Sequence, residues 1–298
     1  MAKQKILITG AAGFLGTKLR KVLGKDKIFS IIGTDLQPRE EGIIKLDITD
    51  KEVVIKIFKE QRPNVVIHTA AMSDVDGCED RKELAWKINV DGTKNIVEGC
   101  NAVDCTMLHI STDFVFDGER GNYTEHDTPN PLYYYAKTKY AGEQAVQDNC
   151  KDWIIVRPEV LYGFNGNNTE RSFTVWAVQN LKEKKRIDVV NDQYSTPTLI
   201  DDIAHAIGVL IKKRKRGIWH VAGPDRLSRH DMAVALAEEF GLDKKLIIPI
   251  TSEALKQKAL RPRDSSLNTE KLKDNGIMMH GFREGVKMMR EQMEEHKQ

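Results

Sequence analysis

Short apolar runs rich in β-branched residues alternate with longer amphipathic stretches over the first half of the chain. The runs that predict strands are Lys5–Thr9, Ile28–Thr34, Val65–His68, Met107–Ile110 and Trp153–Val156. The stretches that predict helices are Phe14–Leu23, Lys51–Glu60, Glu83–Gly99 and Tyr134–Asn149. Strands that are apolar throughout, each followed by a helix, are typical of a parallel sheet with helices on both faces. The pattern therefore predicts an α/β fold with a doubly wound parallel sheet of the Rossmann type.

The regular alternation weakens after Arg157-Pro158. The later elements that the pattern predicts are helices over Glu170–Lys184 and Asp201–Lys213, strands over Ile187–Val190 and Ile218–Val221, and mostly helix from Ser228 to Gln298. We expect residues 1–160 to form a nucleotide-binding domain, with a segment at about 187–222 returning to its sheet. Residues 161–186 and 223–298 are expected to form a smaller, mixed α/β substrate lobe.

Composition and charge narrow the classes of partner. Among 298 residues, 46 Lys and Arg face 44 Asp and Glu, so no large net charge attracts nucleic acid or anionic lipid. No apolar run approaches the ~20 residues of a spanning helix, and the N-terminus lacks the apolar stretch of a signal peptide. The four cysteines have neither metal-site spacing nor the density of a disulfide scaffold. We expect a cytoplasmic protein with free thiols that binds neither nucleic acid nor membranes.

Three glycines follow the first predicted strand and open the first predicted helix, in the run Gly10-Ala11-Ala12-Gly13-Phe14-Leu15-Gly16. Gly10 suits a tight turn, Gly13 allows close approach of a pyrophosphate, and Gly16 allows the helix to pack on the strand. Free N–H groups at the start of the helix, near Phe14 and Leu15, attract phosphate oxygens. The spacing is G-x-x-G-x-x-G and not G-x-G-x-x-G, but its position between strand and helix predicts a dinucleotide site.

The second predicted strand ends at Asp35, where a carboxylate accepts hydrogen bonds from the adenosine ribose hydroxyls. A carboxylate repels a 2′-phosphate, whereas Arg39, four residues later, would attract one. We therefore expect NADH as the cofactor, with NADPH as the alternative. Asp47 and Ile48 follow a short apolar run and are placed to reach the adenine edge.

A Tyr and a Lys four residues apart share one face of a helix, about 6 Å apart along its axis. The ammonium group then favours the phenolate, which lowers the tyrosine pKa and makes the tyrosine a usable acid or base. Two pairs have this spacing, Tyr133 with Lys137 and Tyr135 with Lys139. We favour Tyr135 and Lys139, because small residues follow this tyrosine and leave the next turn open for close packing.

Polar side chains follow the strand that ends at Ile110, in the run Ser111-Thr112-Asp113. Side chains at the carboxyl end of a parallel strand face the cofactor crevice. Thr112 is therefore placed to hydrogen-bond a substrate carbonyl together with Tyr135, with Ser111 as the competing choice.

These motifs together resemble the extended short-chain dehydrogenase/reductases and, within them, the dTDP-4-dehydrorhamnose reductases. The resemblance covers essentially the whole chain. Its motifs are Thr9–Gly16, His68–Ala71, Asn89–Thr93, Ser111–Gly118, Tyr135–Lys139, Arg157-Pro158, Thr196–Thr198 and Arg261-Pro262. The glycine and Tyr/Lys motifs occur throughout the superfamily, whereas the run Ser-Thr-Asp-Phe-Val-Phe is similar to the reductase branch.

The resemblance implies a catalytic set of Thr112, Tyr135 and Lys139, with Lys139 also binding the nicotinamide ribose. The other cofactor contacts that it implies are Ala70 and Ala71 on the adenosine side and Pro158 beside the nicotinamide. The substrate contacts that it implies are Ser111, Thr112, Asp113, Tyr135 and Arg261. Members that bind a metal at a dimer contact carry Glu where this chain has Lys18, so we expect no metal. A homodimer is left open.

The implied activity is reduction, with NADH or NADPH, of the 4-keto group of a nucleotide-activated 6-deoxy sugar. An epimerase of the same extended family is one alternative, since it would share the fold and the catalytic set. A dehydratase is disfavoured, because those enzymes need a second acid where Phe114 follows Asp113. The other alternative is a cofactor-binding regulatory subunit resembling the β subunit of methionine adenosyltransferase.

Overall fold

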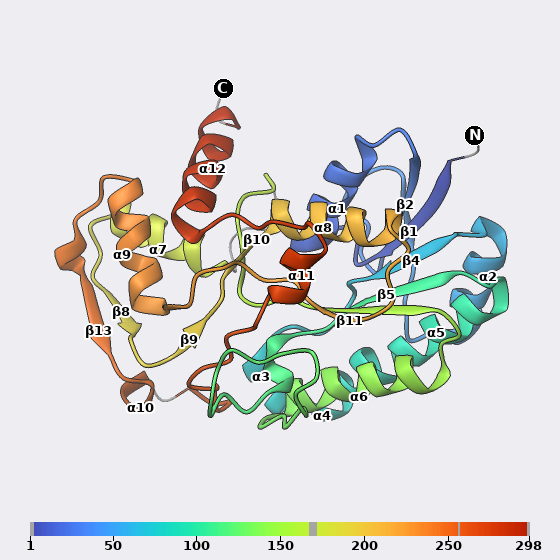
Figure 1. The fold of residues 1–298 in the computed structure, drawn as a ribbon, viewed down its shortest axis with the longest axis horizontal. Coiled ribbons are helices and arrows are strands. Elements are labelled where there is room, and N and C mark those ends of the chain that lie inside the picture. The colour runs from blue at the N-terminus through green and yellow to red at the C-terminus, as the bar shows by residue number, and fades with distance from the viewer. Residues whose placement is uncertain (1–2, 167–171, 256, 297–298) are drawn as a thin grey trace.

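A seven-stranded parallel sheet forms the centre of the molecule (Figure 1). The computed structural model describes residues 3–166, 172–255 and 257–296. The strands, in the order in which they lie side by side, are β11 (Gly217–His220), β6 (Trp153–Arg157), β5 (Thr106–Ile110), β4 (Val65–His68), β1 (Gln4–Thr9), β2 (Phe29–Asp35) and β3 (Ile43–Lys45). All five strands predicted in the first half lie in this sheet, which confirms the doubly wound Rossmann-type fold.

Helices cover both faces of the sheet (Figure 1). One layer is α1 (Phe14–Gly24) and α8 (Ile200–Lys212), and the other is α2 (Lys51–Gln61), α5 (Gly92–Val103) and α6 (Tyr134–Asn149). Alternate residues of β1 point to opposite faces of the sheet. Ile6 and Ile8 pack in the core under α1, and Leu7 packs in the core under α2. Burial on both faces explains why these strands are apolar throughout.

The helix predicted over Glu83–Gly99 is divided. It consists of α4 (Lys82–Trp86), a π-helical turn (Lys87–Asp91) and the start of α5, preceded by α3 (Val75–Asp80). The wide turn brings Asn89 inward, where its amide accepts from the backbone N–H of Met72 at 2.8 Å and donates to Thr138 Oγ1 at 2.9 Å. Tertiary hydrogen bonds therefore set the helix geometry here.

A second lobe packs around its own apolar core. Its main elements are α7 (Phe173–Lys182), β8 (Ile187–Val190), α9 (Arg229–Glu239), β13 (Ile247–Ile250) and α12 (Phe282–Glu295). Two short strand pairs complete the lobe. β7 (Leu161–Tyr162) pairs in parallel with β10 (Thr198–Leu199), and β9 (Tyr194–Ser195) pairs antiparallel with β12 (Leu227–Ser228). The remaining short elements are α10 (Ser252–Leu255), α11 (Glu270–Asp274) and the 3₁₀ turns Asp113–Val115 and Lys244–Leu246.

The segment that returns to the central sheet is shorter than the predicted range of about 187–222. Strand β8 pairs with β13 in the second lobe and not with the central sheet, so the start of that range was wrong. Ile187 and Val189 enter the core of the lobe together with Leu236 of α9. Helix α8 and strand β11 do return, and β11 becomes the edge strand beside β6. The apolar run alone could not identify its pairing partner.

A buried ion pair connects three helices that lie far apart in the sequence. Lys18 of α1 donates from Nζ to Asp201 of α8 at 2.8 Å and to Gln292 Oε1 of α12 at 3.2 Å. Lys18 is 3% exposed, and burial lowers the pKa of its ammonium group while Asp201 acts to raise it. This contact connects the C-terminal helix α12 to α1 and α8, which cover the central sheet.

No helix in the described part of the chain is long and apolar enough to cross a membrane. The described residues also contain no group of three or more His, Cys, Asp or Glu side chains arranged for a metal ion.

Candidate active site

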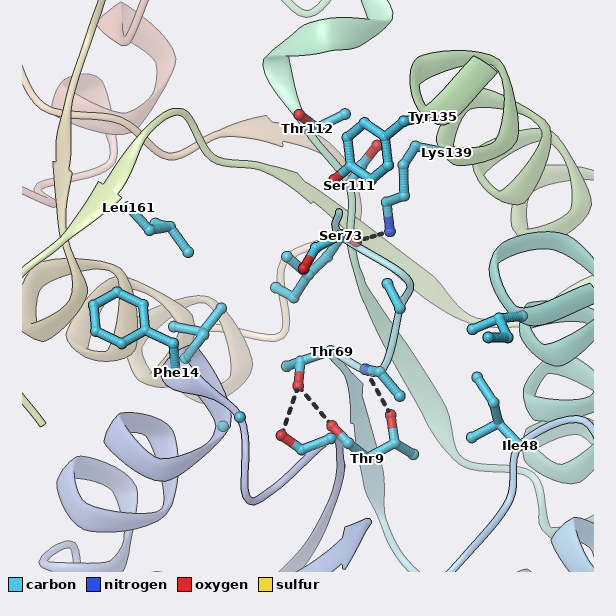
Figure 2. Close-up of a pocket in the computed structure, with 18 of the residues that line it drawn as sticks. Thr9, Phe14, Ile48, Thr69, Ser73, Ser111, Thr112, Tyr135, Lys139 and Leu161 are labelled. Carbon is cyan, nitrogen blue, oxygen red and sulfur yellow. Dashed lines mark hydrogen bonds between the residues drawn. The ribbon is translucent and has the colours of Figure 1, made fainter. Parts of the chain in front are cut away.

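A cavity of about 740 Å³ opens at the carboxyl ends of the central strands. Sixteen of the predicted site residues line it: Gly10, Gly13, Phe14, Leu15, Gly16, Asp35, Asp47, Ile48, Ala70, Ala71, Ser111, Thr112, Asp113, Tyr135, Lys139 and Pro158. Figure 2 shows Phe14 and Ile48 near one end of this cavity, and Thr112, Tyr135 and Lys139 near the other. The fold therefore brings together residues that are spread over 149 positions of the sequence, from Gly10 to Pro158.

The glycine-rich turn requires glycine for steric reasons. Gly10 has a φ of +66°, and a Cβ there would lie 2.9 Å from the backbone nitrogen of Ala70. A Cβ on Gly16 would lie 2.1 Å from the carbonyl oxygen of Gly10. The turn is also fixed to the end of β4, because Thr69 Oγ1 donates to the carbonyl oxygen of Thr9 at 2.6 Å (Figure 2). This close backbone packing leaves the start of α1 open to the cavity.

Asp35 supports the glycine-rich turn from the end of β2. Its Oδ2 accepts from the backbone N–H of Ala12 at 3.0 Å, and its Oδ1 accepts from the backbone N–H of Gln37 at 2.9 Å. Each carboxylate oxygen keeps acceptor capacity for a ribose hydroxyl. Arg39 is exposed and lines the neighbouring hollow together with Asp35 and Gly13, so both predicted determinants of cofactor preference lie at the same end of the site.

The end of the cavity near Ile48 has an apolar wall that the sequence reasoning found only in part. Ile48 was predicted, whereas Leu84 and Ile88 were not. These two residues come from α4 and the π-helical turn. The sequence did not identify them as site residues, because both fit the ordinary apolar positions of an amphipathic helix.

Of the two candidate Tyr/Lys pairs, only Tyr135 and Lys139 line the cavity among the described residues. Both side chains are buried, and Lys139 Nζ donates to the carbonyl oxygen of Ile110 at 2.7 Å (Figure 2). Tyr133 is buried outside the cavity, and Lys137 is exposed to solvent. The preferred pair thus lies beside Ser111 and Thr112 at the end of β5.

The electrostatics of this pair differ from the sequence-based expectation. Burial raises the pKa of Tyr135, the carboxylate of Asp113 raises it further, and hydrogen bonding with Thr112 opposes the increase. Burial also lowers the pKa of Lys139 to about 8, and Glu143 opposes that change. The predicted lowering of the tyrosine pKa is therefore wrong for this structure, because desolvation of the phenolate dominates. A neutral phenol at this position is suited to donate a proton.

Two buried carboxyl groups, Asp113 and Glu159, follow the ends of β5 and β6. Asp113 is 3% exposed; its Oδ1 accepts from Thr112 Oγ1 at 3.0 Å, and burial raises its pKa to about 6. Glu159, which the sequence reasoning missed, accepts from the backbone N–H of Thr196 at 2.7 Å and from Ser265 Oγ at 2.9 Å. Burial and the nearby Asp113 raise the pKa of Glu159 well above its usual range. These bonds connect the end of β6 to segments of the second lobe.

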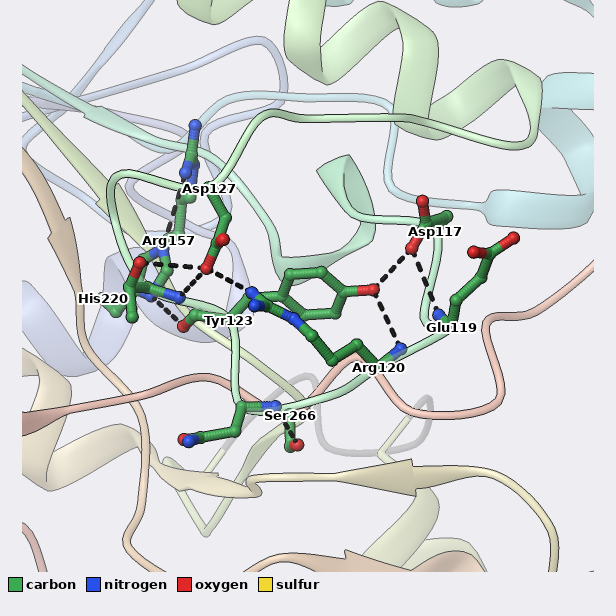
Figure 3. Close-up of polar contacts among 10 residues, drawn as sticks. Asp117, Glu119, Arg120, Tyr123, Asp127, Arg157, His220 and Ser266 are labelled. Carbon is green, nitrogen blue, oxygen red and sulfur yellow. Dashed lines mark hydrogen bonds and ion pairs between the residues drawn. The ribbon is translucent and has the colours of Figure 1, made fainter.

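The loop after Thr112 is held by a stacked aromatic pair and by polar contacts of Tyr123 and Asp117, which Figure 3 shows. The rings of Phe116 and Tyr123 lie parallel with centroids 4.3 Å apart, and Tyr123 Oη donates to Asp117. His220 Nδ1 lies 3.0 Å from the carbonyl oxygen of Tyr123, which ties the loop to β11. The guanidinium carbon of Arg157 lies 5.1 Å from the centroid of the Phe116 ring. The loop that follows Thr112 is thereby fixed to the central sheet.

Arg261 is the one predicted site residue that the structure does not place in the cavity wall. It pairs with Asp76 at 3.1 Å, and its guanidinium lies 5.7 Å from the ring centroid of Tyr133. A different arginine, Arg229 at the start of α9, lines the cavity that Tyr135 and Lys139 also line. No local motif marks Arg229, because its place depends on how the second lobe folds back.

Comparisons with known proteins agree with this geometry. The family model described as RmlD substrate binding domain matches residues 4–295. The chain is similar to dTDP-4-dehydrorhamnose reductase from Salmonella typhimurium, with 32% identity over 97% of this chain and 97% of that protein. It is also similar to methionine adenosyltransferase 2 subunit beta from Bos taurus, with 31% identity over 95% of this chain and 86% of that protein.

A solved structure with the same architecture is dTDP-4-dehydrorhamnose reductase from Bacillus anthracis in complex with NADP. It has a TM-score of 0.88 and 32% identity, and the match covers 97% of this chain and 99% of that one. The family match and this likeness both extend over nearly the whole chain, through both lobes. The chain therefore belongs to the RmlD substrate binding domain family, whose members here include dTDP-4-dehydrorhamnose reductases.

Proposed function

We propose that this protein reduces the 4-keto group of a nucleotide-activated 6-deoxy sugar with a nicotinamide cofactor. The observation that carries the proposal is the placement of Thr112, Tyr135 and Lys139 in one cavity with the glycine-rich turn. The reductase relatives, similar over nearly the whole chain, support the same chemistry.

The cavity fits an extended dinucleotide. A volume of about 740 Å³ suits a ligand of this size, and the tight turn at Gly10 presents backbone where a pyrophosphate would lie. Asp35 would hold the adenosine ribose, Ile48 the adenine, and Pro158 would lie beside the nicotinamide. When bound, NADH or NADPH supplies the hydride. Asp35 favours NADH, whereas the Bacillus anthracis relative was solved with NADP, so both cofactors are candidates.

The residues of the chain supply the proton and the positioning. Thr112 Oγ1 and Tyr135 Oη hold the carbonyl oxygen of the substrate, and Tyr135 donates its proton to the oxygen as negative charge develops on it. Burial keeps the phenol protonated at neutral pH, which is the form that this step needs. Lys139, fixed by its bond to the Ile110 carbonyl, places a positive charge near the developing phenolate and would bind the nicotinamide ribose.

The direct test is to mix purified protein with dTDP-4-dehydrorhamnose and either NADH or NADPH. We expect loss of the reduced nicotinamide absorbance and formation of a dTDP-6-deoxy sugar, identified by mass spectrometry. The proposal would be overturned if the protein turned over the sugar neither with NADH nor with NADPH. Cofactor that purifies with the protein in oxidised form, without net turnover, would instead favour an epimerase.

A regulatory subunit is the second candidate, and the relatives named methionine adenosyltransferase 2 subunit beta favour it. Such a subunit would bind cofactor without turnover and would co-purify with a partner enzyme. Tagged full-length protein, isolated from its own cells and assayed for both properties, distinguishes the two candidates.

We further propose that the protein acts in the cytoplasm, where its four cysteines stay reduced, and that it forms a homodimer. All four thiols are buried and free. Light scattering after size exclusion measures the assembly, and a monomeric mass at working concentrations would contradict the homodimer.

A further inference from the structure

Residues 258–261, which follow β13 and α10, form a clasp on α3. Arg261 donates from Nη1 to Asp76 Oδ1 and from Nη2 to Asp76 Oδ2, both at 3.1 Å. Asp76 Oδ1 also accepts from the backbone N–H of Ala259 at 2.9 Å. Asp76 is the second residue of α3, so these bonds tie that helix to a segment more than 180 positions later in the chain.

The pair between Arg261 and Asp76 is better built than an ordinary surface ion pair. Exposed pairs contribute little, because solvent screens them and both side chains lose freedom. The side chain of Arg261 is only 14% exposed, and its two terminal nitrogens engage both oxygens of the carboxylate. Nη1 also donates to the carbonyl oxygen of Ala259 at 2.8 Å, which fixes the guanidinium to its own segment. Lys258 and Asp80, by contrast, form an exposed pair beside it.

Helix α3 is bonded in turn to the start of α6, the helix that carries Tyr135 (Figure 1). Glu79 Oε1 of α3 accepts from the backbone N–H of Tyr134 at 2.7 Å, and Tyr134 is the first residue of α6. The first N–H groups of a helix have no partner inside the helix, so Glu79 supplies one. Asp76 and Glu79 lie in one short helix, which therefore connects the clasp to α6.

A buried apolar cluster fills the space between the clasp, α3 and the start of α6. It contains Ala259 of the clasp, Cys78 of α3, and Tyr133, Tyr135 and Ala136 of the third element and the residue before it. Ala259 is 1% exposed and Cys78 is fully buried. Tyr135 thus packs in this cluster and at the same time lines the cavity.

The contacts of Arg261 lie within the protein. Its terminal nitrogens are directed at Asp76 and Ala259, and it does not line the cavity that holds Tyr135. A change at Arg261 can therefore reach the reaction only through the elements that the clasp holds. The element that connects the two is α3.

We propose that Arg261 is a positioning residue, which holds Tyr135 in place through Asp76 and α3 and does not contact the substrate. This inference rests on the proposed function, since Tyr135 is the proton donor of the proposed reduction. It gives the chain after β13 a part in the reaction without a place in the cavity.

The kinetic test is Arg261→Met, which keeps most of the side-chain length and removes the donors. We expect kcat for reduction of the keto sugar to fall about 10- to 100-fold, because a small displacement of a catalytic group has a cost of this order. Arg261→Lys keeps the charge and one donor group, so it should lose less. The affinity for dTDP-rhamnose, measured by calorimetry on the cofactor-loaded protein, should change less than about twofold in both variants.

The Tyr135→Phe background separates positioning from general loosening of the fold. If Arg261 acts through the phenol, Arg261→Met should lower the residual kcat of Tyr135→Phe by less than about twofold. An equal fall of kcat in both backgrounds would contradict the inference. So would a loss of dTDP-rhamnose affinity of about tenfold in Arg261→Met, because it would assign Arg261 to the substrate.

A second readout needs no turnover. Cys78 lies in the cluster behind Tyr135, so release of the clasp should raise its rate of alkylation by iodoacetamide about tenfold, measured by mass spectrometry. Cys100 is the internal control, since it is buried in a separate core cluster under α5, and its rate should not change. Arg283→Met is the matched control variant, because Arg283 is exposed on α12 and pairs with Glu238. It should leave kcat and both alkylation rates unchanged.

The two proposals fail separately. If the wild-type protein does not reduce the keto sugar, the proposed function fails, and the alkylation rate of Cys78 alone decides whether the clasp holds α3 against α6. If the wild-type protein reduces the sugar, but Arg261→Met leaves kcat and the Cys78 rate unchanged, the positioning role fails and the function stands.

Discussion

Lys139 donates a hydrogen bond from its ammonium group to the carbonyl oxygen of Ile110, with the two atoms 2.7 Å apart. Ile110 is the last residue of β5, and Ser111 and Thr112 follow it directly. The bond therefore fixes α6, which carries Tyr135, to the strand end that carries Thr112. Positioning of this kind, in place before a ligand binds, removes part of the entropic cost of the reaction.

Replacing Tyr135 by Phe should lower kcat by ~10²–10⁴-fold, because it removes the proton donor and keeps the ring. Cofactor affinity, measured by fluorescence quenching, should be unchanged. Tyr133→Phe is the control, since Tyr133 is buried outside the cavity and its hydroxyl has no partner in the described structure. A larger loss of kcat in Tyr133→Phe than in Tyr135→Phe would show that Tyr133, and not Tyr135, is the proton donor.

Lys139 should make the stability of the protein depend on pH. Its pKa is about 8 in the folded chain, against 10.5 for an exposed lysine. Between these values the unfolded chain binds more protons, so the free energy of unfolding rises with pH across this window. The cost of the buried charge is fully present below about pH 8.

The measurement is urea unfolding at several pH values for the wild type, Lys139→Met and Lys137→Met. The wild type should gain on the order of 3 kcal/mol relative to Lys139→Met between about pH 8 and pH 10.5. Lys137 is exposed, so Lys137→Met should track the wild type throughout. A difference between the wild type and Lys139→Met that stays constant with pH would contradict the shifted pKa.

The sequence predicted residues of the glycine-rich turn that line the cavity, because these residues are local. Gly10, Gly13 and Gly16 lie within one turn, and their steric roles depend on the backbone of that turn. Tyr135 and Lys139 are likewise fixed by helical spacing. The sheet followed from uninterrupted apolar strands, since only a sheet buried on both faces requires them.

The parts that the sequence could not predict depend on long-range pairing. Arg229 reaches the cavity only because the chain pairs β12 with β9 and then starts α9 there. The π-helical turn has no local signal, because the hydrogen bonds of Asn89 to Met72 and Thr138 create it. The desolvation that raises the pKa of Tyr135 also depends on packing, which helical spacing does not reveal.

The Lys18–Asp201 pair should contribute strongly to stability because Lys18 is almost fully buried. Asp201→Asn leaves the ammonium group without its counter-charge, and we expect it to lower the free energy of unfolding by about 3 kcal/mol. Asp104→Asn, in the exposed pair with Lys151, should cost less than about 1 kcal/mol. Chemical denaturation of both variants at one pH measures the difference, and equal costs would show that burial does not strengthen the first pair.

Asp35 and Arg39 should determine cofactor preference in opposite directions. Asp35→Asn removes the negative charge that repels a 2′-phosphate but keeps the length of the side chain, so it should lower the KM for NADPH about tenfold and raise the KM for NADH. Arg39→Ala should raise the KM for NADPH about tenfold and leave the KM for NADH nearly unchanged, because only NADPH carries the phosphate that the guanidinium would contact.

Steady-state rates with each cofactor at saturating nucleotide sugar give these values. Thermal unfolding of the free variants controls for loss of the bonds from Asp35 to Ala12 and Gln37. If both substitutions change the two KM values in parallel, these residues shape the turn and do not discriminate between the cofactors.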